Sequence, residues 1–147
     1  MRLWSFHPKY LDAVGLSRLI NEGISGYKAL TGQQKMWQNH PQLTRFKNSR
    51  YSKDFLQSYL KCIIMFQLEK KSKEIDWDDC PKSYSFWFNE IKVTEGQLKY
   101  EWQHYLKKLQ KRNKKLYNEL KSIEIPSPHP IFRVVKGDIE SWEKVKL

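Results

Sequence analysis

Apolar side chains recur at helical spacing in three stretches of the chain, and each stretch predicts a helix. The first covers residues 12–30, where Asp12 can cap the start and one face carries Leu16, Leu19, Ile20, Gly23, Tyr27 and Leu30. The second covers residues 52–73, with a broad apolar face on Phe55, Leu56, Tyr59, Leu60, Cys62, Ile63 and Phe66. The third covers residues 94–123, with one stripe made of Leu98, Trp102, Tyr105, Leu109, Leu116, Leu120 and Ile123.

The segments between these helices have a different character. Residues 31–50 are polar and basic, with Gly32 and the pair His40-Pro41, which predicts a loop with short helical turns. Residues 74–93 predict an ordered connection, and the residues after Pro126 predict an extended tail laid across the helices. We therefore expect an all-α fold: a single compact domain over residues 1–147 with about three main helices, long ordered loops and an extended C-terminal tail.

Composition adds that aromatic side chains must supply much of the core. The chain has six Trp, eight Tyr and seven Phe among 147 residues, so disorder is not expected. Cys62, within the apolar run CIIMF, predicts a buried structural thiol. Cys62 and Cys80 are too few for a disulfide scaffold, and the four histidines form no close ligand pair, so neither a metal site nor a cofactor is expected.

The acidic and aromatic clusters between the second and third helices each allow two interpretations. Asp76, Asp78 and Asp79 lack the glycine and terminal glutamate of a calcium loop, which favours a solvated turn. The aromatic cluster Tyr84, Phe86, Trp87 and Phe88 could stack on bases, although core packing is the commoner use.

The net charge of +11 is unevenly distributed and indicates a polyanionic partner. Residues 1–50 carry eight Lys or Arg against two acids, residues 51–100 carry eight of each, and residues 101–147 carry eleven against six. Nucleic acid is the leading partner, with an anionic membrane surface second. No apolar run could span a bilayer and the start lacks the apolar core of a signal peptide, so we expect a soluble, cytoplasmic monomer.

Several polar positions are candidates for function, each with a plainer alternative. The run from Lys107 to Lys115 has six cations and no acid, which fits either phosphate contact or a solvated helix face. Gly23 and Gly26 weaken a helix, so they suggest a close approach by a backbone or ligand, or a broken helix. Three histidines, His7, His40 and His129, each precede proline and could reach a phosphate or move a proton from a fixed loop.

The chain start offers a nucleophile. An α-amine titrates near pH 7.7–8.0 and a lysine near 10.4, so far more of the α-amine is neutral and able to attack carbon at pH 7. Such an amine can displace a base at deoxyribose C1′ to give an imine, and β-elimination then cleaves the strand. A nearby carboxylate must stabilise the positive sugar and move protons. Glu22 is one of two acids in residues 1–50, although Arg18 and Glu22 could equally form an ordinary i,i+4 ion pair.

Three stretches carry a resemblance to a known family: MRLWSFHPKYLD at the start, NHPQLTRF at 39–46, and HPIFRVVKGDIESWEK near the end. They resemble the bacterial branch of the pyrimidine-dimer DNA glycosylases. This resemblance implies a catalytic amine at Met1, retained because Arg2 is bulky, an arginine beside it at Arg2, and a catalytic glutamate at Glu22. It also implies a compact all-α fold, glycosylase and abasic-site lyase steps without metal, and an extruded base. Family arginines are replaced by Asn21 and Ser25, and a family histidine by Gly15.

We therefore expect a DNA repair glycosylase with abasic-site lyase activity, acting on pyrimidine dimers or another base lesion in double-stranded DNA. The expected catalytic residues are Met1 and Glu22. The expected DNA-contacting residues are Arg2, Arg18, Asn21, His40, Arg45, Lys111 and Lys115. The alternative is a non-catalytic basic nucleic-acid-binding protein with the same fold, and an RNA partner also stays open.

Overall fold

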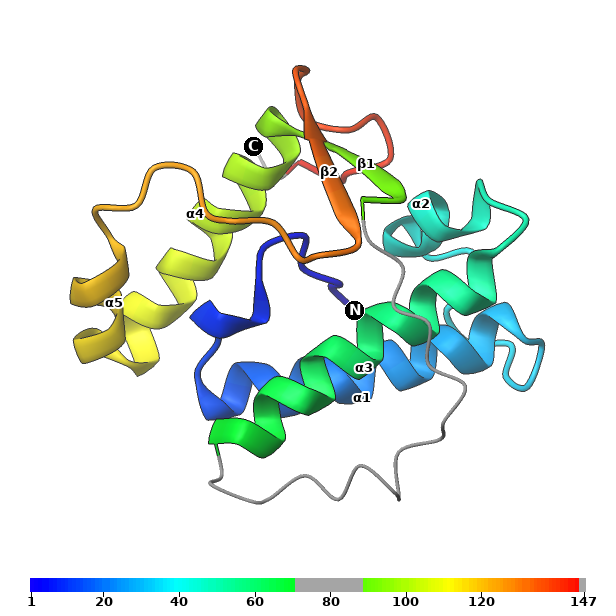
Figure 1. The fold of residues 1–147 in the computed structure, drawn as a ribbon, viewed down its shortest axis with the longest axis horizontal. Coiled ribbons are helices and arrows are strands. Elements are labelled where there is room, and N and C mark those ends of the chain that lie inside the picture. The colour runs from blue at the N-terminus through cyan, green and yellow to red at the C-terminus, as the bar shows by residue number, and fades with distance from the viewer. Residues whose placement is uncertain (71–88, 146–147) are drawn as a thin grey trace.

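A computed structural model describes residues 1–70 and 89–145 and confirms the mostly helical class, to which it adds one small parallel sheet (Figure 1). The acidic and aromatic clusters between residues 76 and 88 lie outside the described residues. In chain order the elements are η1 (Pro8–Tyr10), α1 (Ala13–Leu30), η2 (Pro41–Leu43), α2 (Thr44–Lys47), α3 (Ser52–Lys70), β1 (Ile91–Thr94), α4 (Glu95–Arg112), α5 (Lys114–Leu120) and β2 (Phe132–Val135).

The first helix begins as predicted, whereas the third is two helices. Asp12 caps α1 by accepting a hydrogen bond from the Gly15 N–H at 2.9 Å. The expected helix over 94–123 is wrong because Asn113 leaves the helical conformation, at φ −148° and ψ 76°, between α4 and α5. Its side chain accepts from the Leu116 N–H and so caps the start of α5. An apolar stripe at helical spacing does not reveal a break of one residue, because both halves bury the same face.

The sheet was not predicted from the sequence. β1 and β2 pair in parallel with Ile91 opposite Phe132, and α4 and α5 connect them. Only two residues of β1, Ile91 and Val93, alternate toward the core. A four-residue strand gives too short an alternation to be distinguished from a loop. The expected extended tail after Pro126 contains β2.

Helices α1 and α3 lie side by side and form one layer of the domain (Figure 1). Glycines in α1 allow this approach. A Cβ atom at Gly23 would lie 2.2 Å from Cδ2 of Leu60 on α3, and one at Gly26 would lie 3.1 Å from Cδ2 of Leu43. The close approach expected at these glycines is thus made by apolar side chains of the core.

The N-terminal segment runs through the middle of the molecule, between the α1–α3 layer and α4 (Figure 1). Leu3 and Phe6 are fully or almost fully buried. Buried backbone groups need hydrogen-bond partners, and here side chains supply several of them. The side chains bonded to the backbone of residues 3–5 are Gln42, Arg45, Tyr59 and Glu101.

The residues after Pro126 also bind the backbone of the N-terminal segment. The His129 N–H donates to the Ser5 carbonyl at 2.7 Å, and the His7 N–H donates to the Ser127 carbonyl at 2.8 Å. Phe6 and Pro128 form an antiparallel bridge. The first residues of the chain therefore form an extended segment inside the domain (Figure 1), which we call the central segment.

The three His-Pro pairs share one local structure. In each, the histidine Nδ1 accepts a hydrogen bond from the backbone N–H two residues later, at 3.0 Å for His7, 3.2 Å for His40 and 3.1 Å for His129. The first two pairs begin η1 and η2. Because the proline fixes the turn and Nδ1 is used as an acceptor, these rings act as local caps in their neutral form.

Burial of His129 makes stability depend on pH. Its Nε2–H donates to the Tyr59 carbonyl at 3.1 Å, and burial lowers the pKa of His129 from 6.5 to about 3. The unfolded chain binds a proton at this ring below about pH 6.5, whereas the folded chain does not. We therefore expect the free energy of unfolding to fall by up to about 1.4 kcal/mol per pH unit between pH 6.5 and 3 from this group.

Urea unfolding of the wild type and His129→Gln at several pH values from 7.5 to 4 measures this contribution. The variant, although less stable at pH 7.5, should lose stability less steeply as the pH falls. Parallel curves for the two proteins would contradict the assignment.

Candidate active site and DNA-binding groups

Glu22 lies on α1 next to the start of the chain. Its Oε2 accepts a hydrogen bond from the backbone N–H of Arg2 at 2.9 Å, which places the carboxylate one residue from the α-amine. The Met1 side chain packs on the same helix, with its sulfur 3.6 Å from where a Cβ of Gly26 would lie. The structure thus brings together the two residues expected to be catalytic. Among the described residues, Glu22 forms no salt bridge with Arg18.

One pocket is lined by both Met1 and Glu22. It has a volume of about 170 Å³ and is lined by Met1, Asn21, Glu22, Ser25 and Trp37. Asn21 and Ser25, the two positions where the resemblance expects arginine, thus form one wall. Trp37 also lines this pocket, and its backbone is in the left-handed conformation, with φ 73°.

A second, smaller pocket is also lined by Glu22. Its volume is about 60 Å³, and its cationic lining residues are Arg2, Arg18, Lys108 and Arg112. Trp4 and Tyr105 complete its walls with Gly15, Leu19 and Glu22 itself. We call this cavity the cationic pocket. Arg112 and Arg2 form salt bridges with Asp12 and Glu143, so Arg18 and Lys108 are the charges of this pocket that favour an anionic ligand, such as a phosphate group.

Lys108 and Arg112 have different surroundings in the cationic pocket. Partial removal from water lowers the pKa of Lys108; Glu22 opposes that shift, and Arg112, Arg2 and Arg18 reinforce it. Arg112 forms a bidentate pair with Asp12, at 2.6 and 2.9 Å. A Cβ at Gly15 would lie 3.2 Å from the Arg112 guanidinium. The glycine that replaces a family histidine therefore leaves room for Arg112.

Arg2 is held by the C-terminal segment. Its guanidinium donates to both oxygens of Glu143, at 3.0 and 3.1 Å, and lies over the Trp4 ring. Gln97 also donates to Glu143, at 2.8 Å. Burial alone would raise the pKa of Glu143, but hydrogen bonds from Arg2 and its glutamine neighbours keep that pKa below the usual value. Arg2 is thus a fixed charge at the edge of the cationic pocket.

Arg45 has buried protein partners. Its side chain is 5% exposed and lies 3.5 Å from Glu101, and it also donates to Ser5 Oγ and the Leu3 carbonyl. In the described part of the chain, the Arg45 Nε has no hydrogen-bond partner. A guanidinium so enclosed cannot contact a DNA phosphate without leaving the core, so its position differs from that expected of a DNA-contacting residue.

The remaining expected DNA-contacting residues lie around the pockets. His40 stacks edge-on against Trp37 with ring centroids 5.0 Å apart; burial lowers the pKa of His40, and the N-terminal amine lowers it further. Lys111 and Lys115 are exposed on α4 and α5 and line neither pocket. The structure therefore groups Met1, Arg2, Arg18, Asn21 and Glu22, leaves His40 adjacent, and separates Lys111 and Lys115.

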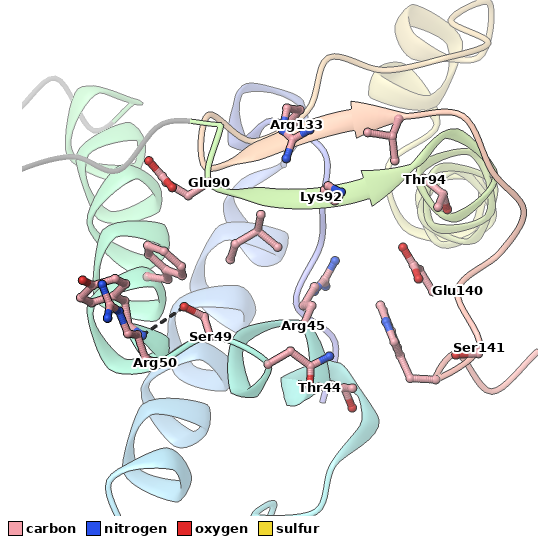
Figure 2. Close-up of a pocket in the computed structure, with 16 residues that line it drawn as sticks. Thr44, Arg45, Ser49, Arg50, Glu90, Lys92, Thr94, Arg133, Glu140 and Ser141 are labelled. Atoms are coloured by element: carbon pink, nitrogen blue, oxygen red, sulfur yellow. Dashed lines mark hydrogen bonds between the residues drawn. The ribbon is translucent and has the colours of Figure 1, made fainter.

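A larger groove of about 810 Å³ lies on a different part of the surface (Figure 2). It runs between α2, the start of α3 and the small sheet, and its exposed basic residues are Arg50, Lys92 and Arg133. Figure 2 shows the Arg45 side chain between α2 and the small sheet, where it lines the groove. Neither Met1 nor Glu22 lines this groove, so it is separate from the candidate active site.

Comparison with models of known protein families gave a match to the first part of the chain. Residues 1–67 match the model of the family described as pyrimidine dimer DNA glycosylase. The matched part of the chain belongs to this family. The matched part contains Met1, Arg2 and Glu22. The family implies a DNA substrate. Searches of curated proteins and of solved structures gave no match.

Two further findings concern residues 1–70 and 89–145, which the structure describes. None of their helices combines the length and apolarity needed to cross a membrane. No group of three His, Cys, Asp or Glu side chains in residues 1–70 and 89–145 could hold a metal ion.

Sequence reasoning missed several residues of the site. Lys108 and Arg112 lie in the basic run from Lys107 to Lys115, from which the sequence predicted Lys111 and Lys115 as the DNA-contacting residues. Tyr105, Lys108 and Arg112 recur at i, i+3 and i+7, which is one helix face, and this spacing could have selected them. Trp37 and Glu143 carried no signal of their own, because each reaches the site only through tertiary structure.

Proposed function

We propose that this protein is a DNA glycosylase with abasic-site lyase activity whose nucleophile is the Met1 α-amine. The observation that carries the proposal is the position of Glu22, which bonds the backbone N–H of Arg2 at 2.9 Å and lines a pocket together with Met1. The membership of residues 1–67 in the pyrimidine dimer DNA glycosylase family supports the same reaction class.

The chemistry needs an amine and a carboxylate and proceeds in two parts. The neutral amine bonds to deoxyribose C1′ while the C1′–N bond to the base breaks, and the base leaves with a proton. Opening of the sugar ring gives an imine. Loss of a C2′ proton then breaks the C3′–O bond and releases the phosphate end of the strand. Glu22 stabilises the positive charge that develops on the sugar and accepts or donates the protons.

The cationic pocket supports binding of the DNA backbone beside the reacting sugar. Arg18 and Lys108 supply positive charge close to Glu22, whereas arginines expected at positions 21 and 25 are absent from this chain. We propose that these side chains contact a phosphate next to the lesion. Arg45, by contrast, is proposed to position the N-terminal segment.

Borohydride trapping tests the amine. The protein is mixed with duplex DNA that contains one abasic site, borohydride reduces the imine, and mass spectrometry of the digested adduct identifies the modified residue. We expect a covalent adduct on the peptide that carries Met1. Lys108→Arg is the matched control, because it removes the other amine near Glu22 but keeps a positive charge, and its adduct should still lie on the peptide that carries Met1.

Two results would overturn the mechanism. An adduct on Lys108 would show that the nucleophile is the lysine of the cationic pocket and not the Met1 amine. Salt-sensitive DNA binding without any adduct would favour the non-catalytic nucleic-acid-binding protein.

A further inference from the structure

The loop of residues 31–39 brings an exposed apolar side chain next to the candidate active site. Met36 is 66% exposed, more than any other large apolar side chain in the described part of the chain. The next residue, Trp37, lines the pocket that contains Met1 and Glu22. A methionine therefore projects into water immediately beside the proposed reaction centre.

Side-chain hydrogen bonds fix this loop to α1. The Gln34 Nε2 donates to the Ser25 carbonyl at 2.9 Å and to the Met36 carbonyl at 3.1 Å. Because Ser25 also lines the pocket, one amide group joins the pocket wall to Met36. Gln38 donates in turn to the Gln34 carbonyl at 2.9 Å. The tip of the loop is therefore built to a defined position.

The backbone of Trp37 carries strain that a looser loop would avoid. Its φ of 73° is in the left-handed region, which costs a bulky residue on the order of 1–3 kcal/mol. Gly32, in the same loop, takes φ 75° without that cost. A tryptophan at position 37 places an indole in the pocket wall and against His40, and leaves Met36 outside.

We propose that Met36 enters the base stack of duplex DNA at the lesion and fills the space of a nucleotide that leaves the helix, with Trp37 as a wall for the extruded group. This inference rests on the proposed function. A base must leave the stack before its sugar can be attacked, and unstacking costs a few kcal/mol per step. An unbranched apolar side chain inserted between base pairs offsets that cost. Lys35, exposed beside Met36, is placed to contact the adjoining phosphate.

Trapping rates on two substrates test the insertion. Met36→Ala should trap about ten- to a hundredfold more slowly than the wild type on an abasic duplex and equally fast on single-stranded abasic DNA, where no stack has to open. Met36→Leu should keep most of the duplex rate. Ile125→Ala, which shortens another exposed apolar side chain, is the matched control and should change neither rate.

A fluorescence measurement makes the test independent of catalysis. A 2-aminopurine base placed beside a stable abasic analogue brightens when it is unstacked, and binding of the wild type, but not of Met36→Ala, should increase its emission. An unchanged duplex rate and unchanged emission for Met36→Ala would overturn the insertion, as would equal losses on both substrates. Absence of any adduct with the wild type would count against the proposed function, and the fluorescence would still decide the role of Met36.

Discussion

Glu22→Gln should lower the rate of adduct formation with abasic duplex DNA by about a hundredfold to ten-thousandfold, the range that a positioned acid or base contributes. The amide oxygen can still accept the hydrogen bond from the Arg2 N–H, so the N-terminal segment should keep its place. What the substitution removes is the negative charge and the ability to exchange a proton. The loss should therefore appear in the rate at saturating DNA, with DNA affinity nearly unchanged.

Single-turnover trapping with excess protein measures that rate directly. Glu119→Gln, which neutralises an exposed acid on α5, changes the net charge equally and should trap like the wild type. A Glu22→Gln protein that traps within a few-fold of the wild type would exclude Glu22 from the chemistry. Unequal circular dichroism spectra of the two variants would reveal a folding defect instead.

Arg45→Met should lower the free energy of unfolding by about 3–5 kcal/mol, because it leaves the buried Glu101 carboxylate without its cation. Glu101 is fully buried and bonds the Ser5 N–H at 2.6 Å, while Arg45 bonds Ser5 Oγ and the Leu3 carbonyl. The pair therefore fixes the central segment to α2, which carries Arg45, and to α4, which carries Glu101. Loss of one partner should weaken the hold on the segment that carries the α-amine.

Urea unfolding measures the change, with Arg50→Met as the control. Arg50 is exposed, so its replacement should cost no more than about 0.5 kcal/mol. The double variant Arg45→Met, Glu101→Gln should recover part of the lost stability, because it removes the unpaired charge and keeps an oxygen that accepts the hydrogen bond from the Ser5 N–H. Equal losses in the single and double variants would show that the charge of Glu101 is not the cause.

The sequence predicted the elements with long periodic patterns and failed at short ones. α1 and its Asp12 cap follow from local rules, and so does the start of α3. The break at Asn113 and the pairing of β1 with β2 depend on one residue and on two four-residue strands, which periodicity does not resolve.

Prediction of the site had a similar limit. Met1, Arg2 and Glu22 were found through the resemblance, and the structure brings them together. Arg45 was expected to contact DNA because charge suggests exposure, but its burial is decided by Glu101, fifty-six residues away in the chain. Glu143 and Trp37 reach the site through contacts that no local pattern encodes.

The central position of the chain start has a consequence for synthesis. Residues 2–5 leave the ribosome before Glu101, His129 and Glu143, which are among their final partners. The segment that bears the proposed nucleophile can therefore reach its place only after the chain has been made as far as Glu143. Until then its apolar side chains, Leu3 and Phe6 among them, remain available to chaperones or to wrong partners.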